Sequence, residues 1–274
     1  MLQRLILSTG ESVPVIGIGS WLRFDIGESS SKRNELKQVL ALMHQHKASV
    51  IDSSPMYGRS EQVIGELTDE TGLANEFFYA TKVWTSGRQA GIKQMNESMQ
   101  RMRRSTMDLI QVHNLVDWQT HLGTLQEWKK EGRIRYTGIT HYQVSFHSQL
   151  AKIIEQGAVD FVQFNYSIAT RHAEKNLLPL AMEKGVAVII NEPLEKGALF
   201  QKVKSKPIPS WAADYEIKSW ASFFLKYIIS HPAVTCVIPA TGNPLHMRDN
   251  LLSGEDPLPD EKGRKKMADY FDTL

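Results

Sequence analysis

Four ionisable side chains stand at or just beyond the ends of three short apolar segments of this 274-residue sequence. They are Asp52, Tyr57, Lys82 and His113. A lysine near a tyrosine hydroxyl favours the phenolate and should lower the tyrosine pKa, and an aspartate that pairs with the lysine holds it in place. A histidine beside the tyrosine can form a hydrogen bond with a carbonyl oxygen. The set suits proton donation to a developing alkoxide near neutral pH.

None of these four groups can reduce carbon, so a cofactor that carries hydride is implied. Each residue also has a structural alternative when it is considered alone. Asp52 could cap a helix, Lys82 could extend its ammonium group to solvent, and His113 could be a hydrogen-bonded core residue. Tyr57 could be a loop aromatic. Their joint placement at one edge favours chemistry over four independent accidents.

The elements that must position these residues are short, apolar, β-branched segments typical of strands buried on both faces. Eight of them recur, and most are followed by a stretch with the apolar period of a helix, as in residues 37–46, 92–102, 120–131 and 173–184. Most steps between segments are roughly 25–30 residues, which fits one strand, one helix and two short loops. The eight segments begin at Val13, Ser49, Phe77, Met107, Arg135, Phe161, Val186 and Thr235.

This pattern predicts an α/β fold, a (β/α)8 TIM barrel that forms one domain over residues 1–274, with its functional residues at the carboxyl ends of the strands. Residues 5–14 predict an N-terminal β-hairpin that closes the bottom of the barrel. Residues 211–230 predict a helix inserted before strand 8, and residues 256–274 a polar segment followed by a helix outside the ring. A doubly wound dinucleotide-binding sheet is disfavoured because the GIGSWL segment at residues 17–22 lacks the third glycine of its fingerprint.

Composition excludes several classes of function. The 32 basic and 30 acidic residues give a net charge of +2 with no long basic run, which disfavours nucleic-acid binding. The only cysteine, Cys236, excludes an internal disulfide and fits a buried small residue better than a reactive thiol. No apolar run is long enough for a membrane span, no signal-peptide pattern occurs, and no strand end carries paired histidines. We therefore expect a cytoplasmic monomer without a metal site.

The four residues, in this order and spacing, resemble the aldo-keto reductase superfamily, in particular its bacterial-type members, over nearly the whole chain. Asp52 to Gly58 resembles the D-x-A-x-x-Y-G segment of that family, with Ser54 where alanine is commoner. Segments 81–84 (TKVW), 111–113 (QVH) and 17–21 (GIGSW) resemble its other motifs. The resemblance implies that Tyr57 is the general acid in reduction, that Lys82 and Asp52 tune it, and that His113 orients the carbonyl. It also implies a nicotinamide cofactor, bound extended across the barrel mouth.

The resemblance assigns the nicotinamide half of the cofactor to residues near the ends of several strands. Thr140 and His141 stand where serine and asparagine are usual, and Gln163 matches a glutamine that contacts the carboxamide. Asn191 replaces the tyrosine that stacks on the ring, so another aromatic group could take that place. The expected residues of this half are Ser20, Trp21, Asp52, Thr140, His141, Gln163, Asn191, Pro193 and Leu194.

The adenosine half is assigned to the last strand and to the helix that follows, whose N-terminus can hold a phosphate. Relatives often carry lysine at the position of Ala240 and arginine at that of His246. We expect NADP(H), because neither Ala240 nor Thr241 is acidic and His246 and Arg248 are near, while NAD(H) stays open. The expected residues here are Ile238, Ala240, Thr241, Gly242, His246, Arg248, Asp249 and Asn250.

The predicted function is reduction of an aldehyde or ketone to an alcohol by hydride transfer from NADPH, with Tyr57 as general acid. The expected partner is a small-molecule carbonyl substrate, in a pocket that Trp21, Trp84 and Trp118 line. The alternative is a barrel that binds NADP(H) with little turnover, as a redox-sensing or regulatory subunit.

Overall fold

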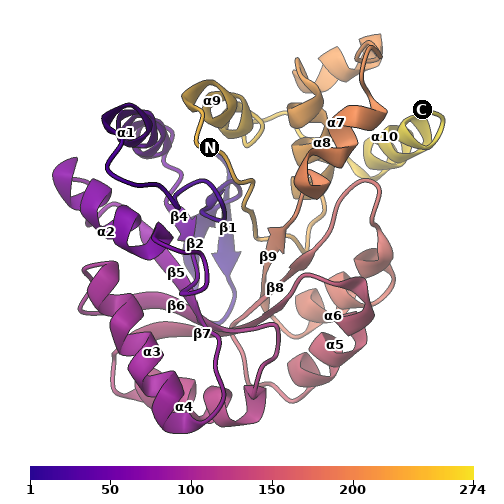
Figure 1. The fold of residues 1–274 in the computed structure, drawn as a ribbon. Coiled ribbons are helices and arrows are strands. Elements are labelled where there is room, and N and C mark those ends of the chain that lie inside the picture. The colour runs from indigo at the N-terminus through magenta and orange to yellow at the C-terminus, as the bar shows by residue number, and fades with distance from the viewer.

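The computed structural model describes residues 1–274, and an eight-stranded parallel sheet lies at its centre with helices around it (Figure 1). The order along the sheet follows the chain, from β3 to β10, and the bridge between Ile16 and Val237 brings its two ends together. The predicted barrel is therefore confirmed. Its strands are β3 (Ile18–Gly19), β4 (Val50–Asp52), β5 (Phe78–Val83), β6 (Met107–His113), β7 (Ile134–His141), β8 (Phe161–Asn165), β9 (Ala187–Asn191) and β10 (Cys236–Val237).

Helices alternate with the strands, and their apolar faces are buried against the outer side of the sheet. Sixty-one buried residues form the continuous core that includes these faces. No helix is long and apolar enough to cross a membrane. The helices are α1 (Ser30–Gln45), α2 (Ser60–Glu70), α3 (Arg88–Arg101), α4 (Trp118–Lys130), α5 (His147–Glu155), α6 (Leu177–Glu183), α7 (Ala198–Lys202), α8 (Trp220–Ile229), α9 (Pro244–Leu252) and α10 (Glu261–Asp272).

The N-terminal hairpin pairs β1 (Gln3–Ile6) with β2 (Glu11–Pro14) in antiparallel register. Its buried Ile6 and Val13 join a second, smaller core made of side chains from inside the barrel. The expected closure of the barrel interior by this hairpin is confirmed. Cys236 belongs to the same interior cluster, where burial raises the pKa of its thiol, so it is a small buried residue as expected.

Two helices expected from sequence are interrupted. The stretch 173–184 divides at Asn176 into a 3-10 turn (His172–Lys175) and α6. The insert 211–230 forms a 3-10 helix (Ser210–Tyr215) that ends at Glu216, whose φ is 53°, and then α8. A residue in the left-handed backbone conformation ends a helix, and glycine is the usual residue there. Because glutamate stands at this position, the sequence gives no sign that the helix ends. The C-terminal helix α10 packs on α8 outside the ring, with the Phe224 and Phe271 rings 5.8 Å apart.

Candidate active site

Three neighbouring strands bring the predicted catalytic residues together at one mouth of the barrel. Asp52 and His113 are the last residues of β4 and β6, and Lys82 is the penultimate residue of β5, which lies between them. Tyr57 lies on the loop between β4 and α2. Because parallel strands share the direction of their carboxyl ends, all four side chains reach the same end of the barrel.

Lys82 and Asp52 form a buried ion pair. The Lys82 Nζ atom donates to Asp52 Oδ2 over 2.6 Å and to the backbone oxygen of Ser53 over 2.7 Å. Both side chains are almost fully shielded from solvent. Burial lowers the pKa of Lys82, but the charges and hydrogen bonds of Asp52 and Tyr57 together outweigh it, and the net pKa lies above the usual value. The ammonium group therefore stays charged beneath the mouth.

Two buried amides hold the other carboxylate oxygen of Asp52. Gln111 and Gln163 donate to its Oδ1 atom over 3.1 and 2.9 Å. The Oε1 atom of Gln163 accepts from the Thr140 hydroxyl at 3.2 Å and from the Asn191 amide at 3.5 Å. Gln163, expected to contact a cofactor carboxamide, thus already bonds within the protein at both ends of its amide. Gln111 was not among the expected site residues, and its one signal in the sequence is a polar residue inside a buried strand.

Tyr57 lies above the ion pair and beside His113. The Lys82 Nζ atom is 5.2 Å from the centroid of the Tyr57 ring, and the Tyr57 and His113 rings meet edge to face at 5.9 Å. Burial raises the pKa of Tyr57 by more than the charge of Lys82 lowers it. The expectation that Lys82 lowers this pKa overall is therefore wrong: desolvation of the phenolate dominates. The phenol is consequently protonated at neutral pH and can donate a proton.

His113 is a neutral imidazole in this setting. Burial and the nearby positive charge of Lys82 lower its pKa from 6.5 to about 2. Its Nδ1 atom lies 3.0 Å from the hydroxyl of Ser54, and its ring lines the cavity at the mouth. The exposed indole of Trp84 stands beside it, with ring centroids 6.4 Å apart. With its Nδ1 atom next to Ser54, the neutral His113 ring has its Nε2 atom left for one hydrogen bond with a ligand, and it adds no positive charge to the cavity.

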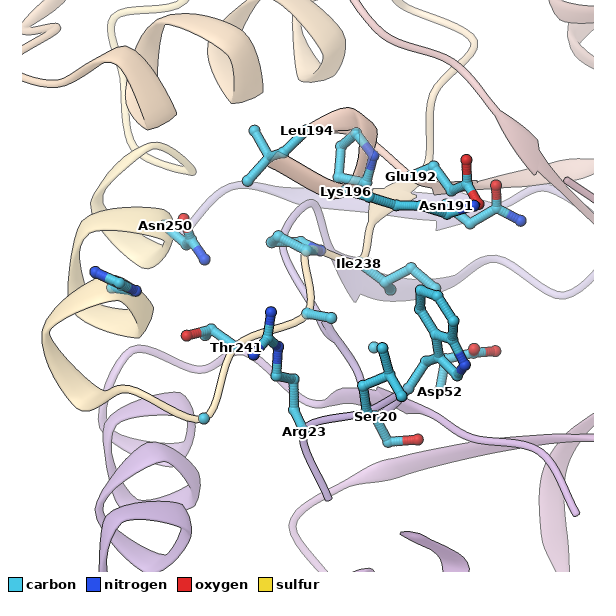
Figure 2. A pocket seen from close by; sticks show the side chains of 18 of the residues that line it. Ser20, Arg23, Asp52, Asn191, Glu192, Leu194, Lys196, Ile238, Thr241 and Asn250 are labelled. Carbon is cyan, nitrogen blue, oxygen red and sulfur yellow. The ribbon is translucent and has the colours of Figure 1, made fainter. Parts of the chain in front are cut away.

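A cavity of about 1250 Å³ extends from these residues across the barrel mouth to α9. Figure 2 shows Asp52, Ser20 and Ile238 toward one side and Arg23, Thr241 and Asn250 toward the other. The volume exceeds the 300–1,000 Å³ common for small-molecule pockets. It leaves room for a long ligand together with a small second one.

The far end of the cavity carries positive charge without a partner. Arg23 lines it, with no ion pair or side-chain hydrogen bond in the protein, and its backbone lies against Gly242. Lys32 and His246 line the same region. Asn243 caps α9 by accepting from the amide of Leu245 at 2.8 Å. Unpaired cations beside a helix N-terminus suit a phosphate-bearing ligand.

The family model described as "Aldo/keto reductase family" matches residues 15–265, nearly the whole barrel. The chain belongs to the aldo/keto reductase family. Aldo-keto reductase YhdN of Bacillus subtilis (strain 168) is 23% identical over 214 residues, which are 72% of this chain and 63% of that protein. The NADH-specific methylglyoxal reductase of Escherichia coli (strain K12) is 24% identical over 231 residues, 72% of this chain and 68% of that protein. The chain thus spans about two thirds of the length of these relatives.

Solved aldo/keto reductase structures share the fold. The enzyme from Klebsiella pneumoniae in complex with NADP and acetate is 22% identical, with a TM-score of 0.81 over 99% of this chain and 96% of that one. At this level of identity the comparison supports the barrel architecture.

Most residues that the family resemblance assigned to the cofactor do line the cavity. His141 and Arg248 do not. His141 follows Thr140 on β7 and points away from it, since side chains alternate along a strand, and its ring stacks on Phe146 at 3.6 Å. Arg248 is exposed on α9, two residues beyond His246 and so on another face of the helix. The assigned residues that line the cavity are Ser20, Trp21, Asp52, Thr140, Gln163, Asn191, Pro193, Leu194, Ile238, Ala240, Thr241, Gly242, His246, Asp249 and Asn250.

The expected aromatic wall of the pocket needs correction. Trp21 lines the cavity, but Trp84 and Trp118 do not. Trp84 lies next to His113, and Trp118 begins α4 and packs against the hydrophobic core. The exposed ring of Tyr142, which sequence reasoning missed, lines the cavity instead. Tyr142 directly follows β7, and its side chain points into the cavity, but no sequence motif indicates this orientation.

Lys196 is a further cavity residue that no sequence pattern indicated. Its Nζ atom lies 5.6 Å from the centroid of a Trp21 ring and 5.5 Å from the Tyr142 ring. It also forms a 3.0 Å ion pair with Glu192. The loop after β9 therefore reaches across the mouth to residues that follow β3 and β7.

Proposed function

We propose that this chain reduces a small aldehyde or ketone to an alcohol by hydride transfer from NADPH, with Tyr57 as the proton donor. The observation that carries the proposal is the convergence of Tyr57 and His113 on one cavity, above the buried Lys82–Asp52 pair. That arrangement places a phenol proton and a neutral imidazole side by side, where the oxygen of a carbonyl group needs a proton and a hydrogen bond.

The residues present fit a nicotinamide dinucleotide. The cavity of about 1250 Å³ is large enough to hold it beside a substrate, and the unpaired cation Arg23 faces the α9 end, where phosphates would lie. Ser20, Trp21 and Asn191 line the end near Tyr57, where the nicotinamide would lie. When bound, this group supplies the hydride for the carbonyl carbon.

The choice of NADPH over NADH rests on the charge at the α9 end. Arg23, Lys32 and His246 line it with no ion pair of their own. Two carboxylates, Glu35 and Asp249, also line the cavity, and Asp249 accepts a 2.6 Å hydrogen bond from Ser219. The three basic side chains therefore outnumber the two acidic ones there. The relatives differ in this respect: the E. coli relative is named NADH-specific, while the K. pneumoniae structure holds NADP.

The protein side of the reaction follows from the site geometry. Tyr57 donates its phenol proton to the carbonyl oxygen, and the resulting phenolate faces the ammonium group of Lys82, which lowers its energy. Asp52 holds Lys82 charged and in place. His113 offers a hydrogen bond to the same oxygen and orients it.

The test is the decay of NADPH absorbance with a panel of aldehydes and ketones, including an activated aromatic aldehyde. Turnover that falls about 10²- to 10⁴-fold in Tyr57→Phe, with NADPH affinity retained, supports the proposal. Tight NADPH binding without turnover on any carbonyl would instead favour a regulatory subunit. If Tyr57→Phe keeps more than half of the wild-type turnover while hydride transfer limits the rate, Tyr57 is not the proton donor.

A further inference from the structure

Ser54 lies behind the His113 ring, on the side away from the cavity. It is two residues beyond the end of β4, and its side chain is completely buried. Its Oγ atom is 3.0 Å from the Nδ1 atom of His113, a residue 59 positions further along the chain. The fold therefore brings the Ser54 hydroxyl within hydrogen-bond distance of one ring nitrogen of His113.

The direction of this hydrogen bond follows from the partners of Ser54. The Oγ atom has one other partner, the backbone amide of Met56 at 3.4 Å. An amide N–H can only donate, so Oγ accepts from Met56. The hydroxyl proton then has one acceptor within reach, the Nδ1 atom of His113. If Nδ1 carried a proton of its own, the proton of the buried Ser54 hydroxyl would have no acceptor, and such unpaired buried groups are disfavoured.

The tautomer of His113 follows in turn. The ring is neutral because burial and Lys82 lower its pKa to about 2. A neutral imidazole carries one proton, so with Nδ1 as acceptor the proton is on Nε2. Nε2 forms no hydrogen bond in the protein and is not among the buried atoms that lack a partner, so it is accessible from the cavity.

We propose that Ser54 is a positioning residue that fixes His113 as the Nε2–H tautomer and so makes it a hydrogen-bond donor to the carbonyl oxygen of the substrate. This role rests on the proposed carbonyl reduction. In the opposite tautomer the Nε2 lone pair would face the oxygen lone pairs and repel them. Tyr57 and His113 then have separate tasks: one transfers a proton, and the other holds the oxygen without giving its proton up.

Nitrogen NMR of the full chain with isotopically labelled histidine tests the tautomer directly, since protonated and unprotonated ring nitrogens resonate apart. His113→Gln identifies the His113 signals by their loss. We expect Nδ1 to be unprotonated and Nε2 protonated in the wild type, and this pattern to be lost in Ser54→Ala. Ser53→Ala removes a neighbouring buried hydroxyl that bonds Ser20 and not His113, so it should leave the pattern in place. A protonated Nδ1 in the wild type would overturn the proposal without any variant.

Kinetics then tests whether the tautomer matters. Ser54→Ala should lower kcat for a carbonyl substrate roughly threefold to tenfold, the size of one neutral hydrogen bond, with NADPH affinity unchanged. Ser54→Thr, which restores a hydroxyl, should recover both the signal and the rate. Unchanged turnover in Ser54→Ala would show that Ser54 has no part in catalysis. If NMR shows His113 protonated on Nε2 but the wild-type protein reduces no carbonyl, the proposed function is contradicted and the tautomer assignment still holds.

Discussion

Gln111 on β6 and Gly138 on β7 are register partners, and the missing side chain of Gly138 leaves room for the buried amide of Gln111. A Cβ atom at position 138 would lie 2.9 Å from Gln111 Cγ and 3.1 Å from the backbone oxygen of Phe161. Barrel interiors are normally filled by branched apolar side chains. Here a glycine admits an amide that reaches Asp52. Gln111 and Gly138, below the mouth, thus help to hold the carboxylate of the Lys82–Asp52 ion pair.

The first prediction concerns Gln111→Met, which keeps the length of the side chain and removes its polar atoms. The Oε1 atom of Gln111 is buried without a partner, at a cost of about 1–3 kcal/mol, while the hydrogen bond that its Nε2 atom donates to the Asp52 carboxylate stabilises by about 1.5–3 kcal/mol. We expect the free energy of unfolding to change little, because the two terms oppose each other. Turnover should fall roughly tenfold, since Asp52 is less firmly held.

Denaturant unfolding and steady-state kinetics on one preparation measure both effects. Wild-type turnover in Gln111→Met would mean that Gln163 and Lys82 are sufficient to hold Asp52. A large loss of stability with unchanged kcat would assign Gln111 to packing alone.

The second prediction concerns pH. If Tyr57 is the proton donor, reduction needs its protonated form, and burial raises the pKa of Tyr57 above its usual value of 10. The rate of reduction should therefore stay level through neutral pH and fall only above about pH 10, while oxidation of an alcohol should speed up as pH rises. His113, with a pKa of about 2, stays neutral and adds no step in the range of roughly pH 5–9. The pH profile of kcat/KM in both directions checks this. An acid-side loss near pH 6.5 that disappears in His113→Asn would contradict a neutral His113.

The sequence predicts the parts of this site that strand geometry determines. Polar residues at the ends of parallel strands meet at one edge, so Asp52, Lys82 and His113 could be placed together without coordinates. Along β7 the family resemblance assigned both Thr140 and His141 to the cofactor, but neighbouring side chains on a strand alternate, so only Thr140 lines the cavity.

Loop residues could not be placed in this way. Arg23 and Lys196 line the cavity because the loops after β3 and β9 turn their side chains inward, and no periodicity describes those turns. Glu216 interrupts the inserted helix through a positive φ at a residue that is normally compatible with a helix. Tyr57 lies on a loop as well, and only the family motif placed it.

The third prediction separates His246 from Arg248. His246 lines the cavity beside unpaired cations, and Arg248 is exposed on another face of α9. His246→Ala should weaken NADPH binding roughly 10- to 150-fold and NADH binding much less, because charge-assisted contacts contribute about 1.5–3 kcal/mol. Arg248→Ala is the matched control and should change neither affinity. Titration of both cofactors by tryptophan fluorescence measures this, and an equal loss for NADPH and NADH would assign His246 to another part of the cofactor.

The last prediction concerns Asn191, which ends β9 where relatives usually offer a tyrosine ring. Its amide makes only a 3.5 Å contact with Gln163, and its Oδ1 atom has no partner, so the side chain is held weakly. Aromatic stacking contributes about 0.5–1.5 kcal/mol beyond buried area. Asn191→Tyr should therefore tighten NADPH binding by up to roughly tenfold.

The same substitution should lower kcat where release of the cofactor limits turnover. Asn191→Leu adds bulk without a ring and controls for mere filling of space. Trp21 and Tyr142, whose rings both flank the Lys196 ammonium group, and Trp220 of the inserted helix are aromatic side chains of the cavity that could already cover this face. Weaker NADPH binding in Asn191→Tyr than in the wild type would show that one of them does so, because a second ring would then clash with it.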